Sequence, residues 1–341
     1  MRETQGPAPR SGWLMSRPTL ERHQVWIYLA AILAGLAGGT TAPAVAGALD
    51  AALWPTLAVL LYATFTQVPL THIAAAFRDG RFMSAQLLGN FILVPLAVWA
   101  LLLVVPDEPA IRLGVLLVLL VPCTDWFVTF AHLGRADTHR AIAATPVNLL
   151  VQLALLPIYL WLFMGHAFLE ILDTQRIAGV FLSLIVLPLT AAWLTERWAE
   201  RAPRRGALVA HLAWLPVPLL AVVVFLIAAS QVQAVLGALP VLGQLTGVFL
   251  AYLVLAAAIG VALGHAFGLS VGATRTLVFS LGTRNSFVVL PLALALPSAW
   301  AAAVVVIVLQ SLVELLGMVA YLWAVPRFVG RPRSPAAAGS G

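Results

Sequence analysis

The sequence has no lysine, a single cysteine and few charged residues. All 19 basic residues of the 341 are arginine, 13 residues are acidic, and charged residues make up only 9% of the chain. A soluble domain typically carries about 25%. One cysteine excludes an internal disulfide and a metal cage built from several thiolates. The shortage of charge excludes an ordinary soluble globular protein.

Nucleotide, metal and catalytic motifs are also missing. The chain has no Walker loop, no dinucleotide fingerprint and no His-x-x-His spacing. No set of nucleophile and base converges, so we expect no cofactor, no metal and no enzymatic activity. The net charge of +6 comes from arginines in loops. We read it as a signal of membrane orientation and expect no nucleic-acid partner.

The sequence is rich in long runs of apolar residues. Hydrophobic residues make up 62%, and the mean hydropathy is +1.00. Because a spanning helix needs about 20 mainly apolar residues, we predict an all-α polytopic membrane protein with ten transmembrane helices. The expected spans are 25–46, 53–76, 84–105, 111–133, 141–164, 177–195, 207–230, 245–267, 274–296 and 300–325.

The parts outside these spans are short. We expect a cytoplasmic N-terminal segment at 1–24, a transmembrane domain at 25–330, and a disordered Pro/Ala/Gly/Ser-rich tail at 331–341. An amphipathic piece at 167–175 would lead into the sixth span. The first apolar run also resembles a cleavable signal peptide, with small residues at 41–46. We favour an uncleaved first span, because the distribution of arginines between loops requires it.

Arginines divide unequally between alternate loops. Sixteen fall in the termini and loops of one side, two (Arg112 and Arg176) fall on the other, and Arg284 lies within a span. Because positive residues favour the cytoplasmic side, both termini should be cytoplasmic. We therefore expect a multi-pass protein of the cell inner membrane with an even number of spans.

Two apolar spans are interrupted by polar residues. The break at 122–125 reads Pro-Cys-Thr-Asp, and the break at 282–286 reads Gly-Thr-Arg-Asn-Ser. Proline removes a backbone donor and tends to break the helix that contains it. We therefore predict that spans four and nine are discontinuous.

The two halves of the chain repeat at a constant offset. Asn148 and Gln152 share one helical face in span five, and Gln310 and Glu314 do so in span ten, with 162 residues between the members of each pair. The same offset carries Cys123 onto the second break. Because each half, about 25–164 and 177–325, holds five spans, the second must be inverted. Inverted repeats with paired broken helices and a midplane site are typical of secondary transporters.

Polar groups inside a membrane are expensive, so those at the breaks are the candidate site. The residues expected to bind solute are Cys123, Thr124, Arg284, Asn285 and Ser286. The residues expected to couple transport to a proton or to sodium are Asp125, Glu314, Gln310, Asn148 and Gln152.

Each charged candidate also has a structural interpretation. Asp125 and Arg284 could form a buried ion pair with each other, or Arg284 could hold an oxyanion in bidentate fashion. Glu314 could serve only as a helix–helix hydrogen bond. Cys123 could be a packing residue, or its soft thiol could contact a thiophilic solute.

These motifs resemble the bile acid/arsenite/riboflavin transporter superfamily over roughly residues 25–325. Pro-Cys-Thr at 122–124 resembles the Pro-Cys-Thr of arsenite efflux permeases, whose cysteine in the fourth span is functionally required. Val313-Glu314 resembles their tenth-span motif, and Asn148 a polar position of their fifth span. The permeases carry Asn-Asn-Phe-Glu in the ninth span, where this chain has Asn-Ser-Phe-Val at 285–288. Asp125 and Arg284 are further departures, so the chain looks like a divergent branch.

The resemblance implies a secondary transporter that exports arsenite, or a related oxyanion such as antimonite, in exchange for protons. The alternative is a sodium-coupled symporter of an organic anion, with Arg284 on its carboxylate or sulfonate. A membrane sensor or scaffold with a transporter-like fold is a third reading. The partners implied are a small anionic or neutral solute and the lipid bilayer. The oligomeric state and the direction of transport stay open.

Overall fold

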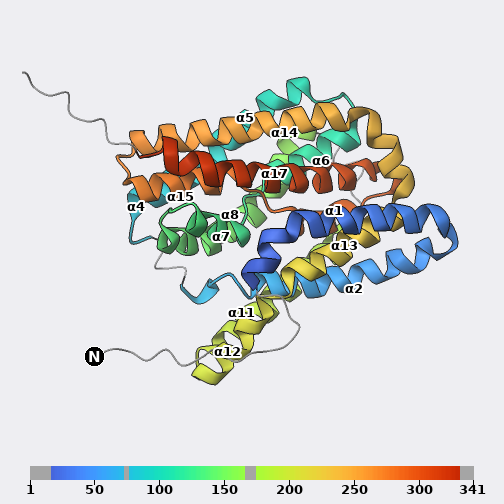
Figure 1. The fold of residues 1–341 in the computed structure, drawn as a ribbon, viewed down its shortest axis with the longest axis horizontal. Coiled ribbons are helices and arrows are strands. Elements are labelled where there is room, and N and C mark those ends of the chain that lie inside the picture. Colours follow the sequence, from blue (N-terminus) through green and yellow to red (C-terminus); the bar gives the residue numbers. More distant parts are fainter. Residues whose placement is uncertain (1–16, 73–76, 166–173, 331–341) are drawn as a thin grey trace, which may run out of the picture.

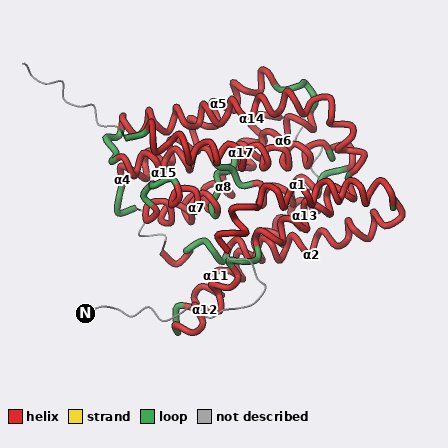
Figure 2. Tube along the Cα trace, in the orientation of Figure 1, coloured by secondary structure: helices red, strands yellow, loops and turns green. Residues whose placement is uncertain are grey.

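The computed structural model describes residues 17–72, 77–165 and 174–330. Almost all of this part of the chain is helical, with no strand within it (Figures 1 and 2). The elements are α1 (Arg17–Thr41), η1 (Pro43–Val45), α2 (Ala46–Phe65), η2 (Leu70–His72), α4 (Gly80–Leu88), η3 (Gly89–Leu93), α5 (Val94–Leu101), η4 (Leu102–Val104), α6 (Pro109–Leu119), α7 (Trp126–Leu133), α8 (Thr138–Met164), α10 (Thr174–Phe181), η5 (Leu182–Val186), α11 (Leu187–Ala199), α12 (Pro203–Leu212), α13 (Pro216–Ser230), α14 (Val232–Ala266), α15 (Val271–Gly282), α16 (Ser286–Leu294), η6 (Ser298–Trp300) and α17 (Ala302–Phe328).

The all-α polytopic membrane class is confirmed. Among the described residues, 8 helices are long and apolar enough to cross a membrane, by length and composition. The two remaining predicted spans are present as pairs of shorter helices, α6 with α7 and α15 with α16. Both interruptions lie where the polar breaks predict them. The inverted relation of the two halves stays a prediction.

Several boundaries differ from those predicted. The second span, expected at 53–76, is α2, which ends at Phe65. There the hydroxyl of Thr66 donates to the carbonyl of Ala63, and Pro69 follows, so the helix does not continue. The eighth span, expected at 245–267, begins earlier, at Val232. The expected tail at 331–341, the N-terminal residues 1–16 and most of the amphipathic piece at 167–175 lie outside the described residues.

Two prolines widen the helices that contain them. The π-helical turns η3 and η5 are each followed, two residues later, by a proline: Pro95 and Pro188. A proline inside a helix lacks the N–H for the carbonyl four residues earlier and clashes with it. For Pro95 that carbonyl belongs to Phe91, and it accepts the hydroxyl of Tyr159 instead. The sequence thereby fixes α8 beside the widened turn.

The helices pack in two groups. In one, α13 contacts both α1 and α2, and α2 contacts α11. In the other, α14 and α17 pack together and against α15 and α6 (Figure 1). The first group uses small residues: a Cβ at Gly39 of α1 would overlap the main-chain oxygen of Ala229 in α13. The half-helix α16 contacts α2 and α10, so the second break lies beside the first group.

Loops predicted to share one side do meet. The guanidinium of Arg275 donates to the carbonyls of Arg135, Pro326 and Val329, at 3.1, 3.1 and 2.9 Å. This joins the loop before α8, the start of α15 and the end of α17. The arginine count assigns all three to the same side, whose cytoplasmic identity stays a prediction.

Candidate functional site

The two helix breaks meet in the interior and pair through their backbones. Pro122 lies opposite Arg284 in an antiparallel bridge. The N–H of Cys123 donates to the carbonyl of Thr283 at 3.1 Å. The half-helices α6 and α15 therefore end at this crossover, and α7 and α16 start from it. All four of these residues are buried, so the crossover is enclosed by the surrounding helices.

A side-chain contact reinforces this backbone pairing. The amide of Asn285 donates to the hydroxyl of Thr124 at 3.1 Å, which links the two breaks. The carbonyl oxygen of the same amide accepts the N–H of Val288 at 3.3 Å and caps α16. Two predicted solute-binding residues are thus held together in one place.

The thiol of Cys123 faces an acid. Its Sγ donates to Oδ1 of Asp125 at 3.0 Å, and Cys123 is fully buried. Asp125 precedes α7, but its side chain does not cap that helix. The carboxylate is therefore oriented toward the thiol, which it holds as a hydrogen-bond donor.

The guanidinium of Arg284 is buried, and no carboxylate of the described residues bonds to it. Its guanidinium donates to the carbonyls of Leu119, Ser280 and Leu281, at 3.3, 3.0 and 2.8 Å, and to Oδ1 of Asn90 at 2.8 Å. Among the described residues, Arg112 and Arg140 form ion pairs, and Arg284 forms none. The structural alternative of an ion pair with Asp125 is therefore wrong, because that carboxylate and this guanidinium bind different groups.

Glu314, on α17, bonds to the backbone of the second break. Its Oε2 accepts the main-chain N–H of Arg284 at 2.8 Å and the Gln310 amide at 2.7 Å. Ser286 lies 3.5 Å from Oε1 of Gln310 and accepts the hydroxyl of Ser311 at 2.7 Å. The second carboxylate oxygen, Oε1, has no hydrogen-bond partner among the described residues. It is the one carboxylate oxygen among the buried unpartnered acceptors of the described residues, so it can accept a proton or bind a cation.

The first-half pair of coupling candidates is divided. Asn148 accepts the amide of Gln86 at 3.4 Å, and Gln86 also bonds the hydroxyl of Ser280. This chain of contacts leads to Asn90, which bonds Ser280 at 3.3 Å. Gln152 is buried too, but neither of its amide atoms has a hydrogen-bond partner in the described part of the chain. The structure connects Asn148 to the crossover and leaves Gln152 unconnected.

Sequence reasoning missed three of the polar residues at this centre. Gln86, Asn90 and Ser280 are all fully buried. The signal was present, because Gln86 and Asn90 are four residues apart in an apolar span, like the pairs that were recognised. Ser280 stands in the last turn of α15, four residues before Arg284, and its carbonyl accepts from the Arg284 guanidinium.

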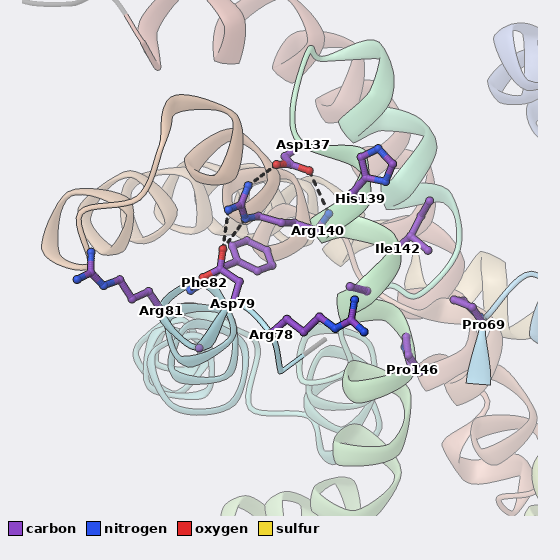
Figure 3. A pocket seen from close by; sticks show the side chains of 12 residues that line it. Pro69, Arg78, Asp79, Arg81, Phe82, Asp137, His139, Arg140, Ile142 and Pro146 are labelled. Carbon is purple, nitrogen blue, oxygen red and sulfur yellow. Dashed lines mark hydrogen bonds and ion pairs between the residues drawn. The ribbon is translucent and has the colours of Figure 1, made fainter. Parts of the chain in front are cut away.

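A separate hollow of about 1010 Å³ lies away from the crossover, at the N-terminal ends of α4 and α8. In it Arg140 lies between Asp79 and Asp137, with Arg78 and His139 nearby (Figure 3). Asp79 and Asp137 each cap their helix. Both carboxylates here form ion pairs with Arg140, so we interpret this cluster as a structural salt bridge that joins α4 to α8. The crossover is then the candidate functional site.

The broken helices, the buried polar crossover and the spanning helices define a multi-pass membrane transporter. The Sodium Bile acid symporter family matches residues 54–238 of the chain. This stretch is more than half of the 341 residues, so the chain belongs to that transporter family. A comparison with curated proteins gives no match. The match begins within α2 and ends within α14, so it includes the first break but not the second.

Proposed function

We propose that this protein is a secondary active transporter whose solute binds at the crossover, and that the solute is arsenite or a related oxyanion such as antimonite, exported in exchange for protons. The observation that carries the proposal is the pairing of the two breaks, which brings Cys123, Thr124 and Asn285 together beside the partly buried Asp125 and the buried Glu314. Discontinuous helices that meet at a polar centre are the usual place for solute and ion sites in secondary transporters.

The thiol supports a thiophilic solute. Sulfur is a soft ligand, and a trivalent metalloid hydroxide is a soft partner for it. Binding exchanges one arsenic-bound hydroxyl for the sulfur of Cys123. The thiol proton, which already points at Asp125, leaves with that hydroxyl as water. The remaining hydroxyls of the metalloid suit the neutral oxygen and amide groups of Thr124, Asn285 and Ser286. A single thiol binds reversibly, as export requires.

Glu314 is the residue that we assign to proton coupling. It is buried, and one carboxylate oxygen has no hydrogen-bond partner in the part of the chain that the structure describes, while the other accepts the main-chain N–H of Arg284 at the crossover. Loss or gain of a proton here changes the charge next to the backbone that joins the two breaks. Solute binding at the crossover and protonation of Glu314 therefore both act on the paired backbone of the two breaks. Asp125 is the second acid within this centre.

The family assignment favours a second candidate, a sodium-coupled symporter of an organic anion. In that reading the oxygens of Gln310, Glu314 and Asn148 would be ligands of the cation, because hard cations prefer oxygen. Sodium-dependent uptake that is indifferent to metalloids would select it. An absence of any solute flux, together with a tightly bound partner protein, would favour the sensor or scaffold reading instead.

Metalloid accumulation in an export-deficient cell tests the leading proposal. We expect cells with the chain to hold less arsenite than cells without it, with the difference depending on pH and not on sodium. Cys123→Ala and Cys123→Ser should both abolish the difference. Export that survives in Cys123→Ser would show that a hydroxyl suffices and would remove the thiol from the mechanism.

A further inference from the structure

The guanidinium of Arg284 occupies a cradle made of neutral oxygens. Arg284 is fully buried, at 0% exposure, and it is the largest fully buried side chain among the described residues. Four oxygens accept from its two terminal nitrogens, and the ring of Tyr252 lies 5.6 Å from its central carbon. A buried charge needs compensation. Here the compensation comes from carbonyl and amide dipoles and from a ring face, with no carboxylate of the described chain bonded to the guanidinium.

Three of these oxygens belong to the ends of broken helices. Leu119 is the last residue of α6, and Ser280 and Leu281 lie in the last turn of α15. The final carbonyls of a helix have no partner within it, and together they form the negative end of the helix dipole. Two such ends are therefore directed at one point inside the protein, and the positive group at that point is the Arg284 guanidinium.

The same arrangement suits a small metal cation. Hard cations select carbonyl and amide oxygens. In secondary transporters the C-terminal ends of half-helices and unwound carbonyls commonly coordinate the coupling cation. The fourth oxygen, Oδ1 of Asn90, completes a set of four neutral acceptors. These four oxygens would stabilise a metal cation as well as a guanidinium, and here the side chain of Arg284 supplies the positive charge.

We propose that the guanidinium of Arg284 is a built-in substitute for a coupling sodium ion, held permanently where that ion would otherwise bind. The inference rests on the proposed function only in assuming that the chain is a transporter; it does not depend on which solute is moved. Because the side chain cannot leave the site, sodium does not drive this protein. The moving charge must then be the proton, and Glu314, whose carboxylate accepts the main-chain N–H of Arg284, is the acid bonded to the residue that carries the fixed charge.

The geometry leaves little capacity for Arg284 to bind a solute anion. Both terminal nitrogens, which form the fork that grips a carboxylate or oxyanion, already donate to protein oxygens. Nε and one of the two N–H groups of Nη1 have no acceptor among the described residues. The expectation that Arg284 contacts the solute directly is therefore replaced by a role as a fixed charge.

Sodium binding by the purified full-length chain in detergent tests the inference. Thermal unfolding is compared in sodium chloride and in choline chloride of equal ionic strength, for the wild type, Arg284→Gln and Arg284→Lys. Wild type and Arg284→Lys, which keep a fixed cation, should show no sodium-specific change. Arg284→Gln removes the charge and adds a carbonyl oxygen, so sodium should raise its Tm by about 3 °C at a tenfold excess over Kd. Arg112→Gln, which removes a half-exposed arginine elsewhere, is the matched control and should behave like wild type.

Two results would overturn the inference. One is a saturable sodium-specific rise in Tm for the wild type that is the same in Arg284→Gln. The other is an Arg284→Gln variant that is folded yet indifferent to sodium, which would mean that the arginine only supports the structure. If Arg284→Gln does not fold, Arg284→Ala with added guanidinium ion gives a second measure. A rise in Tm with guanidinium, absent from wild type, is expected, and no rise would contradict the proposal.

Transport assays separate this inference from the proposed function. In vesicles holding the wild type, flux of arsenite should be unchanged when choline replaces sodium. Flux of a different solute with the same indifference to sodium would remove the arsenite assignment and leave the fixed cation standing. Flux of any solute driven by a sodium gradient in the wild type would reject the fixed cation, whether or not that solute is a metalloid.

Discussion

The main-chain N–H of Asn285 donates to the carbonyl oxygen of Val121 at 2.8 Å, and this bond joins the two halves of the chain at the centre of the protein. This bond and the one from the N–H of Cys123 to the carbonyl of Thr283 flank the bridge between Pro122 and Arg284. In an antiparallel pair, such a position exchanges no hydrogen bonds of its own. Proline, which has no N–H, therefore fits there without cost to the pairing. The residue that breaks the helix is also the one that this bridge tolerates.

Asn285→Ala should disable transport beyond its effect on stability. The substitution removes the cap of α16 and the bond to Thr124. Loss of a cap costs about 1 kcal/mol. Ser270→Ala removes a comparable cap, from α15 at a distance from the crossover, and is the matched control. Solute flux and Tm of both variants would be measured in parallel. Equal loss of flux in the two variants would assign the effect of Asn285→Ala to stability alone.

Glu314→Gln should uncouple transport from protons. The amide keeps the shape of the carboxyl group and can still accept the main-chain N–H of Arg284, but it cannot release a proton. We expect exchange of solute across vesicles to persist and its acceleration by a pH gradient to disappear. Glu108→Gln, in an exposed loop, should keep the pH-driven flux. A Glu314→Gln variant that still responds to the gradient would move the coupling proton to another group.

Gly39→Ala should loosen the packing of α1 on α13. A Cβ there would overlap the carbonyl oxygen of Ala229, and a backbone atom cannot turn aside as a side chain can. We expect a loss of about 1–3 kcal/mol, seen as a lower Tm in detergent. Gly38→Ala, one residue earlier on the same helix, meets nothing within 4 Å and should cost no stability. Since alanine has the higher helix propensity, a Tm that falls equally for both variants would show that the overlap with Ala229 is not the cause.

The salt bridge between Asp79 and Arg140, at the N-terminal end of α4, should give the folding stability a small pH dependence below about pH 4. The N–H of Phe82, and then Arg140, lower the pKa of Asp79, although burial opposes them. Because the folded-state pKa lies below the unfolded one, the ionised carboxylate stabilises the fold above the unfolded pKa. That stabilisation is lost as pH falls through the folded pKa.

Asp79→Asn keeps an oxygen for the cap and removes the charge. The difference in Tm between wild type and this variant should be constant at neutral pH and shrink below about pH 4. A difference that grows on acidification would mean that the pKa of Asp79 is raised in the folded protein.

The local pattern of the sequence was sufficient for the helices and for the breaks. Apolar runs of spanning length and the prolines and polar residues inside them act over a few neighbouring positions. The interruptions at 122–125 and 282–286 are accordingly found as predicted. The polar pairs on single helical faces were equally readable. Gln86 and Asn90 have the same spacing, but the positions 162 residues later are Val248 and Tyr252, so the repeat does not single them out.

Side-chain direction at the crossover needed the tertiary structure. Asp125 and Arg284 are the two charges at the breaks, and attraction between opposite charges made their pairing a reasonable expectation. The fold instead places the carboxylate against the Cys123 thiol and the guanidinium among carbonyls. Which way each side chain turns depends on where helices distant in sequence end, and no local pattern contains that information.

Hydropathy and proline act locally along the chain, so the residues alone were enough to assign a helical membrane protein with two broken spans. The partners of the Arg284 guanidinium were only partly local. Ser280 and Leu281 precede it by four and three residues, whereas Asn90 and Leu119 reach it only after distant helices have packed. A charge buried in a membrane protein is stabilised by the dipoles that the fold places around it, and its sequence neighbours supply only some of them.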